Sequence, residues 1–121
     1  MYICFMYSKE LLKGTLKTVI VSLLKNGERM YGYEITQKVK EVSGDKVLLT
    51  EGALYPMLHK LEAEGVLQTQ TEMIGKRVRK YYKLTKSGAS TADEMVKEFL
   101  DFMETMKIIV EGNNAPQHGF A

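Results

Sequence analysis

The chain has 121 residues, which suits a single domain, and 45% of them are hydrophobic, enough for a real core. No apolar run approaches the roughly 18 residues that span a bilayer, and no secretory signal is recognisable, so we expect a cytoplasmic protein. Cys4 is the single cysteine, which excludes an intrachain disulfide and a cysteine-based zinc cluster.

The net charge of +2 hides an asymmetry. Residues 1–89 hold 15 Lys and Arg against 9 Asp and Glu, whereas residues 90–121 hold 2 against 6. A basic body with an acidic end indicates that the first part meets a polyanion, although ordinary surface variation is the alternative.

Two helices are expected first. Residues 8–27 predict a helix with Ser8 as N-cap and Asn26-Gly27 as its stop. Its apolar residues at helical spacing are Leu12, Leu16, Val19, Ile20, Leu23 and Leu24. Residues 30–44 predict a second helix with an inner stripe of Ile35, Val39 and Val42. Gly32 lies near its start, where a side chain would block a close approach.

Residues 46–49 form a short apolar run that predicts one brief strand, and a third helix follows, capped by Thr50 and stopped at Gly65. Its apolar positions predict an inward face of Ala53, Leu54, Met57, Leu58 and Leu61. Pro56 allows two interpretations: a bend inside a helix capped by Thr50, or a helix that begins nearer Ala53.

After Gly65 the pattern alternates. The runs 66–72 and 78–84 predict a β-hairpin with Gly75 in its turn. Residues 85–112 predict a long last helix capped by Thr85 or Ser87. Its heptad seam consists of Ala92, Met95, Phe99, Phe102, Met106 and Ile109, widened by Val96, Met103 and Val110.

Three helices followed by a hairpin are the layout of a winged helix-turn-helix, whose third helix enters the DNA major groove. The side of this helix opposite its core face holds Gly52, Tyr55, Pro56, His59 and Lys60, and Ala53 is small enough to let the backbone approach. We therefore expect these residues at DNA, the alternative being a plain solvated helix face.

The hairpin carries the sharper charge signal. Between Gly75 and Lys86 there are six basic residues in twelve and no acid, namely Lys76, Arg77, Arg79, Lys80, Lys83 and Lys86. Such a cluster favours contact with phosphates, with Lys76, Arg77, Arg79 and Lys80 as the expected DNA contacts, and a merely solvated hairpin is the alternative.

Three ordered motifs, "YGYEI", "EGALYPMLHKLEAEG" and "GKRVRKYYKLTKSG", resemble the PadR family of bacterial transcriptional regulators, in its smaller form with one C-terminal helix. The resemblance implies a homodimeric winged-helix repressor, with Tyr33, Tyr55 and the basic hairpin near DNA. It also implies release from DNA by a small aromatic or lipophilic effector. Two features depart from it: the chain has no tryptophan to line an effector pocket, and the residues before Met6 suggest an upstream start.

The heptad seam independently predicts a dimer, because Met95, Phe99, Phe102, Met103 and Met106 would otherwise leave apolar surface exposed. These residues either form only dimer core or also line an effector cavity, since methionine repacks readily. The predicted organisation is mainly α with a small β-hairpin: a winged helix-turn-helix domain at 8–88, a dimerisation helix at 89–111 and a loose tail at 112–121.

The motifs expected of an enzyme are missing from the sequence. It has no Ser/His/Asp set in a recognisable context, no metal-ligand cluster and no phosphate-binding glycine loop. We therefore expect no catalysis, cofactor or metal. The competing prediction is a winged-helix module for protein–protein interaction without sequence-specific DNA binding.

Overall fold

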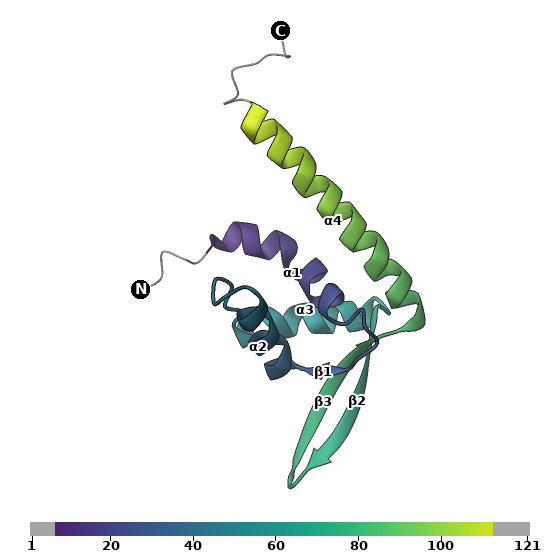
Figure 1. Cartoon of the computed structure of the whole chain (residues 1–121). Coiled ribbons are helices and arrows are strands. Elements are labelled where there is room, and N and C mark those ends of the chain that lie inside the picture. The colour runs from purple at the N-terminus through teal and green to yellow at the C-terminus, as the bar shows by residue number, and fades with distance from the viewer. Residues whose placement is uncertain (1–6, 113–121) are drawn as a thin grey trace.

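The computed structural model describes residues 7–112. Its elements are α1 (Lys9–Leu23), β1 (Met30–Tyr31), α2 (Gly32–Val42), α3 (Glu51–Ala63), β2 (Leu67–Ile74), β3 (Arg77–Leu84) and α4 (Lys86–Gly112). In Figure 1 the first three helices gather into one body, the β2–β3 hairpin projects from it, and α4 extends away on another side. The predicted winged helix-turn-helix with a long last helix is confirmed.

Side-chain caps begin three of the helices as the sequence predicts. Ser8 Oγ accepts from the Leu11 amide at 3.3 Å, and Thr50 Oγ1 accepts from the Ala53 amide at 3.2 Å. Thr85 Oγ1, and not Ser87, accepts from the Gly88 amide at 2.9 Å. Because Thr50 is the cap, Pro56 lies inside α3, and the alternative in which the helix begins nearer Ala53 is wrong.

The core lies between α1, α2, α3 and the base of the hairpin. Its fully buried large side chains are Ile20, Val21, Leu24, Ile35, Leu54, Leu58, Leu61, Leu67 and Tyr82. Two predicted inward positions are wrong. Val42 is 70% exposed because the buried positions of α2 fall on its first two turns, where Thr36 is buried instead. Ala53 lies in the first turn of α3, before the first buried residue of this helix, and it is exposed.

The predicted strand at 46–49 is also wrong. These residues are irregular, Leu48 is 41% exposed, and Leu49 packs against the core. The third strand is β1, which pairs with β3 through Met30 opposite Tyr82 and Tyr31 opposite Tyr81. The sheet order is β1-β3-β2, so β1 takes the edge of β3 that a strand at 46–49 would have needed.

The predicted hairpin is confirmed, with strands that run closer to the turn than expected. Its register runs from Leu67 opposite Leu84 to Ile74 opposite Arg77, which leaves Gly75 and Lys76 as a two-residue loop. Gly75 has a φ of 64°, a conformation that glycine adopts without strain. The base of the hairpin is buried and its outer half is exposed.

Helix α4 is unbroken from Lys86 to Gly112, so it runs through the predicted boundary between residues 88 and 89. Ala92 is buried and Met95 packs against the core, whereas Phe102, Met103 and Ile109 are about half exposed, at 53%, 50% and 51%. The predicted atypical start and all but the first residue of the predicted tail lie outside residues 7–112. Within that range, none of the helices has the length and apolar character that a membrane crossing requires.

Gly88 marks the place where α4 passes the end of α3. A Cβ atom on Gly88 would lie 2.0 Å from the Val66 carbonyl oxygen, which is backbone and cannot swing aside. We expect Gly88→Ala to lower the free energy of unfolding by about 1 to 3 kcal/mol, measured by urea titration. Gly14→Ala is the matched control, since its Cβ meets nothing within 4 Å and the change should stabilise α1 by about 0.5 to 1 kcal/mol. Equal effects of the two substitutions would contradict this account.

Candidate nucleic-acid interface

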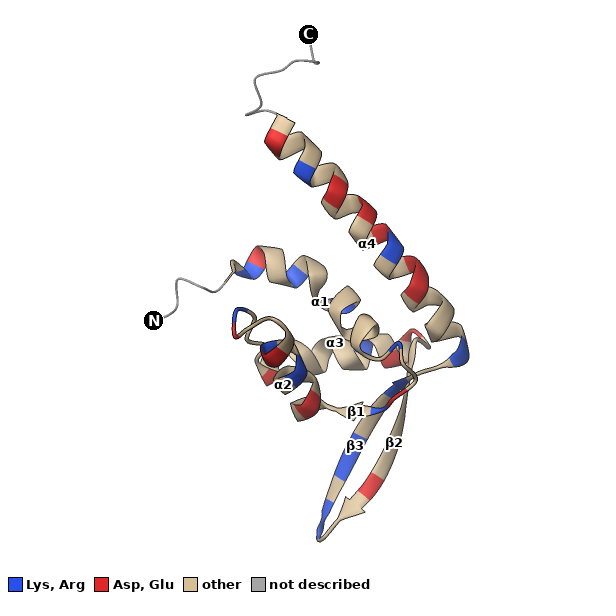
Figure 2. Ribbon diagram, in the orientation of Figure 1, with Lys and Arg blue, Asp and Glu red and all other residues tan. Residues whose placement is uncertain are grey.

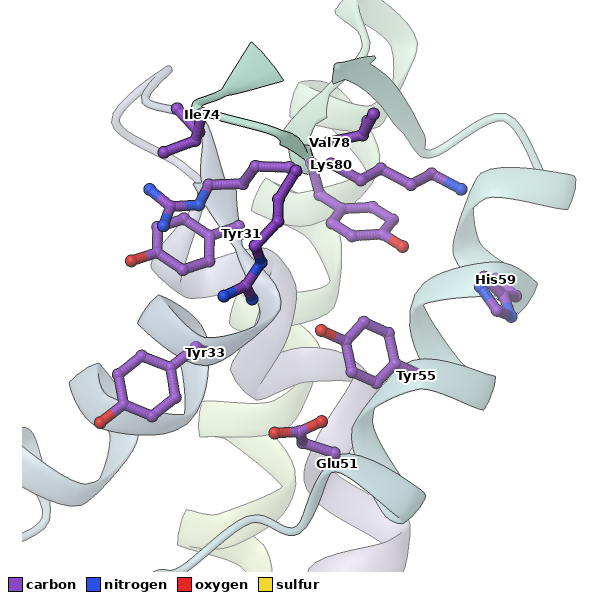
Figure 3. Close-up of a pocket in the computed structure, with 11 residues that line it drawn as sticks. Tyr31, Tyr33, Glu51, Tyr55, His59, Ile74, Val78 and Lys80 are labelled. Atoms are coloured by element: carbon purple, nitrogen blue, oxygen red, sulfur yellow. The ribbon is translucent and has the colours of Figure 1, made fainter. Parts of the chain in front are cut away.

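An open groove of about 860 Å³ lies between the start of α2, one side of α3 and strand β3. Figure 3 shows side chains from all three elements turned toward it. The predicted DNA-contacting residues that line it are Tyr33, Tyr55, His59, Arg77, Arg79 and Lys80. The fold therefore brings together aromatic and basic side chains that are widely separated in sequence.

Four other predicted residues of α3 line a second groove instead. Gly52, Ala53, Pro56 and Lys60 face an apolar groove of about 750 Å³ beside α1 and residues 48–49. The predicted outward side of α3 is thus divided between two grooves. All four residues are exposed, so their contact with DNA stays a prediction.

Tyr55 is held more firmly than a solvated tyrosine. It is half-buried, packs against the core, and its ring centroid lies 6.4 Å from that of His59. A Cβ atom on Gly32 would lie 2.2 Å from Tyr55 Oη and 2.6 Å from Tyr55 Cζ. The missing side chain at Gly32 is what allows the Tyr55 ring of α3 to lie against the start of α2.

The middle of the hairpin is held to β1 and to the loop before it by stacked arginine and tyrosine side chains. The guanidinium carbons of Arg29 and Arg79 lie 4.0 Å from the ring centroids of Tyr81 and Tyr31, respectively. The two rings meet edge to face at 5.5 Å between centroids. These stacked contacts join the loop before β1 and strand β1 to strand β3.

Arg29 also joins the loop before β1 to the hairpin. It forms an ion pair with Glu72 and donates to Gln70 Oε1 at 3.1 Å. The hydrogen bond to Glu72 raises the pKa of Arg29, and a hydrogen bond to Tyr81 raises the pKa of Arg79, so both guanidinium groups stay charged. The sequence reading missed Arg29, because its role depends on the unpredicted pairing of β1 with β3.

The basic residues of the hairpin differ in whether they form ion pairs. Lys80 Nζ lies 3.7 Å from Glu62 Oε1 and 5.5 Å from the Tyr82 ring centroid, so this lysine is turned toward α3. Lys76 and Arg77, at the exposed tip, form no ion pair with any residue in 7–112. Figure 2 shows basic residues recurring along β3 as far as the tip of the hairpin, which projects away from the helices. Burial raises the pKa of Tyr82, which therefore stays a neutral part of the groove wall.

The part of the chain that the structure describes has no group of three His, Cys, Asp or Glu side chains placed to hold a metal ion. What the groove offers is a surface of tyrosines and cations on a helix and a hairpin, suited to a large anion with stacking or hydrogen-bonding groups.

Comparison with known proteins gives a consistent result. Residues 20–94 match the model of the transcriptional regulator PadR-like family. An uncharacterised protein of Lysinibacillus sphaericus is 30% identical over 110 residues, covering 88% of this chain and 98% of that protein. The negative transcriptional regulator PadR of Bacillus subtilis is 34% identical over 93 residues, covering 76% of this chain and 50% of that protein.

A solved structure shows the same fold. The structure of a transcriptional regulator from Clostridium thermocellum has a TM-score of 0.74 and 25% identity, covering 84% of this chain and 95% of that one.

The contact between Gly32 and Tyr55 can be tested by a double-mutant cycle. We expect Gly32→Ala to cost about 1 to 3 kcal/mol of unfolding free energy, because the Tyr55 ring must leave its place. In a Tyr55→Ala background the same change should cost much less, since the obstructing ring is gone. Denaturant titration of the four proteins gives the coupling, and strictly additive costs would mean that the ring moves aside freely.

Proposed function

The chain belongs to the PadR-like family of transcriptional regulators, and we propose that it acts as a homodimeric repressor that binds a near-palindromic DNA operator. The family consists of regulators and not of enzymes, in agreement with the expected lack of catalysis. The observation that carries the proposal is the groove in which tyrosines of α2 and α3 face the basic strand β3.

In this proposal α3 and the hairpin divide the work. The exposed side of α3, with Tyr55 and His59, enters the major groove and contacts base edges. Lys76 and Arg77 contact phosphates, which sets the register of the protein on DNA without reading sequence. Neither side chain forms an ion pair with another residue between 7 and 112, which supports this role because no such pair has to be broken.

The phosphate contacts can be measured through salt dependence. We expect full-length protein to retard its own upstream DNA in a mobility-shift assay, with affinity falling as salt rises. Arg77→Ala should weaken binding to all sequences and reduce the slope of log affinity against log salt by about one unit. Lys97→Ala is the control, because Lys97 is an exposed lysine on α4 at a position away from the heptad seam.

Salt-insensitive binding, or no retardation of any duplex, would favour the competing protein-interaction module. Tyr55→Phe tests the contribution of α3 to DNA binding more specifically, since it removes only the hydroxyl group while the ring keeps its packing.

The exposed apolar side chains on the outer half of α4 support the dimer. Phe102, Met103 and Ile109 are about half exposed at 53%, 50% and 51%, on a helix that Figure 1 shows extending beyond the rest of the fold. A second copy would cover this seam across a twofold axis. The charges of two copies are also complementary. Three lysines, Lys9, Lys13 and Lys60, border the second groove, whereas residues 90–121 carry 2 basic against 6 acidic residues.

The dimer has a matched pair of test substitutions. Phe102 lies on the seam and is 53% exposed, whereas Leu100 is 60% exposed and lies off the seam. We expect Phe102→Asp to raise the dimer dissociation constant by at least tenfold, because a carboxylate would be buried in the interface. Leu100→Asp should leave it nearly unchanged. Sedimentation equilibrium measures both, and a wild-type monomer at high concentration would end the dimer proposal.

The effector is proposed to bind at the same seam, among Met95, Phe99, Phe102, Met103 and Met106. Methionine and phenylalanine side chains form an apolar, adaptable lining for a small aromatic or lipophilic molecule. A panel of such compounds should lower DNA affinity or shift the melting temperature. If none does either, these residues serve only as dimer core.

A further inference from the structure

Glu51 is an acid in a groove that is otherwise built for an anion. It is the first residue of α3 and lines the same groove as Arg77, Arg79 and Lys80. Figure 3 shows its side chain at the start of the helix, between Tyr33 and Tyr55. Glu51 is exposed and has no ion-pair partner among residues 7–112.

A free carboxylate at this place opposes phosphate binding. DNA carries a negative charge at every phosphate, so Glu51 would be repelled if the groove met only the DNA backbone. Favourable partners for a carboxylate on DNA are hydrogen-bond donors, and in the major groove these are the amino groups of cytosine and adenine. A carboxylate at this position therefore favours contact with a base edge over contact with a phosphate.

The position in the helix agrees with this chemistry. The N-terminal residues of a recognition helix are the ones that contact base edges in helix-turn-helix proteins. The Thr50 cap fixes the backbone at this point, since Thr50 Oγ1 accepts from the Ala53 amide at 3.2 Å. Cations on β3 and a carboxylate on α3 can thus meet phosphates and bases, respectively.

Of the two amino groups, cytosine N4 fits better. Adenine presents its N7 lone pair beside the amino group, and a carboxylate would be repelled by it, whereas cytosine presents only its amino donor there. We propose that Glu51 is a specificity-determining residue that accepts a hydrogen bond from cytosine N4 in each operator half-site. This inference rests on the proposed DNA-binding function.

The alternative role of Glu51 is local. An acid in the first turn stabilises a helix through its dipole, by about 0.3 to 1 kcal/mol, whatever DNA is present. Glu10 likewise lies in the first turn of its helix, as the second residue of α1, and is exposed. Glu10→Gln is therefore the matched control for a purely local effect.

The test is selection from a pool of randomised duplexes with the full-length protein, followed by sequencing. We expect the wild type to select a C·G pair at one position of each half-site and Glu51→Gln to select adenine there, because glutamine pairs with adenine N6 and N7. At that position the relative affinity for cytosine over adenine should fall by about 5- to 100-fold. Glu10→Gln should leave the selected sequence unchanged.

The outcomes separate the two proposals. If the wild type selects a sequence and Glu51→Gln selects the same one, Glu51 does not read a base, and the DNA-binding function still stands. A uniform loss of affinity with Glu51→Gln, without a change in sequence, also overturns the inference. If the wild type selects and binds no duplex, the proposed function itself is wrong.

Discussion

The position of β3 in the centre of the sheet is the constraint on which the rest of the structure depends. Tyr82 is 1% exposed in the core, and the same strand pairs with β1 on one edge and with β2 on the other. A hairpin alone is marginally stable in water, so its shape depends on this anchoring. Because one strand joins the core to the basic tip, the hairpin keeps a fixed place relative to α3.

The same anchoring explains why the middle of the hairpin and its tip differ in chemistry. Along the middle of the hairpin, Arg29 and Arg79 stack on tyrosine rings, and Arg29 is neutralised by Glu72. At the tip, Lys76 and Arg77 have neither kind of partner among the described residues. The arginines along the middle thus hold the hairpin to β1 and to the loop before it, and the cations at the tip remain available. A count of basic residues in the sequence cannot make this distinction.

What the sequence predicted correctly was governed by local chemistry. The caps at Ser8, Thr50 and Thr85 and the turn at Gly75 depend on residues only a few positions apart, and these features are present as expected. The strand at 46–49 was wrong and β1 was missed, because strand pairing depends on which edge of β3 is open in three dimensions. Local propensity does not contain that information.

The candidate site, too, could be predicted from the sequence only in part. Tyr33, Tyr55, Arg77 and Arg79 do meet in one groove, as the winged-helix layout implied. Helical spacing placed Gly52 and Lys60 on the same outward side, yet they border a second groove, because α1 and residues 48–49 lie along that flank of α3. Arg29 and Glu51 were not predicted as site residues, because the role of each depends on residues that become its neighbours only in the folded structure.

The connection between α3 and α4 bears on how a dimer would present its two recognition helices. Thr85 Oγ1 caps α4 and also donates to the Gly65 carbonyl oxygen at 2.6 Å, directly after α3. The absent side chain of Gly88 lets α4 lie against the Val66 carbonyl at a distance that no other residue permits. These contacts fix the direction in which α4 leaves the domain.

If two copies associate through α4, that direction sets the separation of the two α3 helices. Half-sites on DNA lie about 34 Å apart or at multiples of this distance, so a small change of angle at the start of α4 is amplified along the helix. A molecule that altered packing along the outer half of α4 could therefore change operator affinity without touching DNA. The contacts of Thr85 with Gly65 and of Gly88 with Val66 hold the start of α4 in place, and this is what would make such control possible.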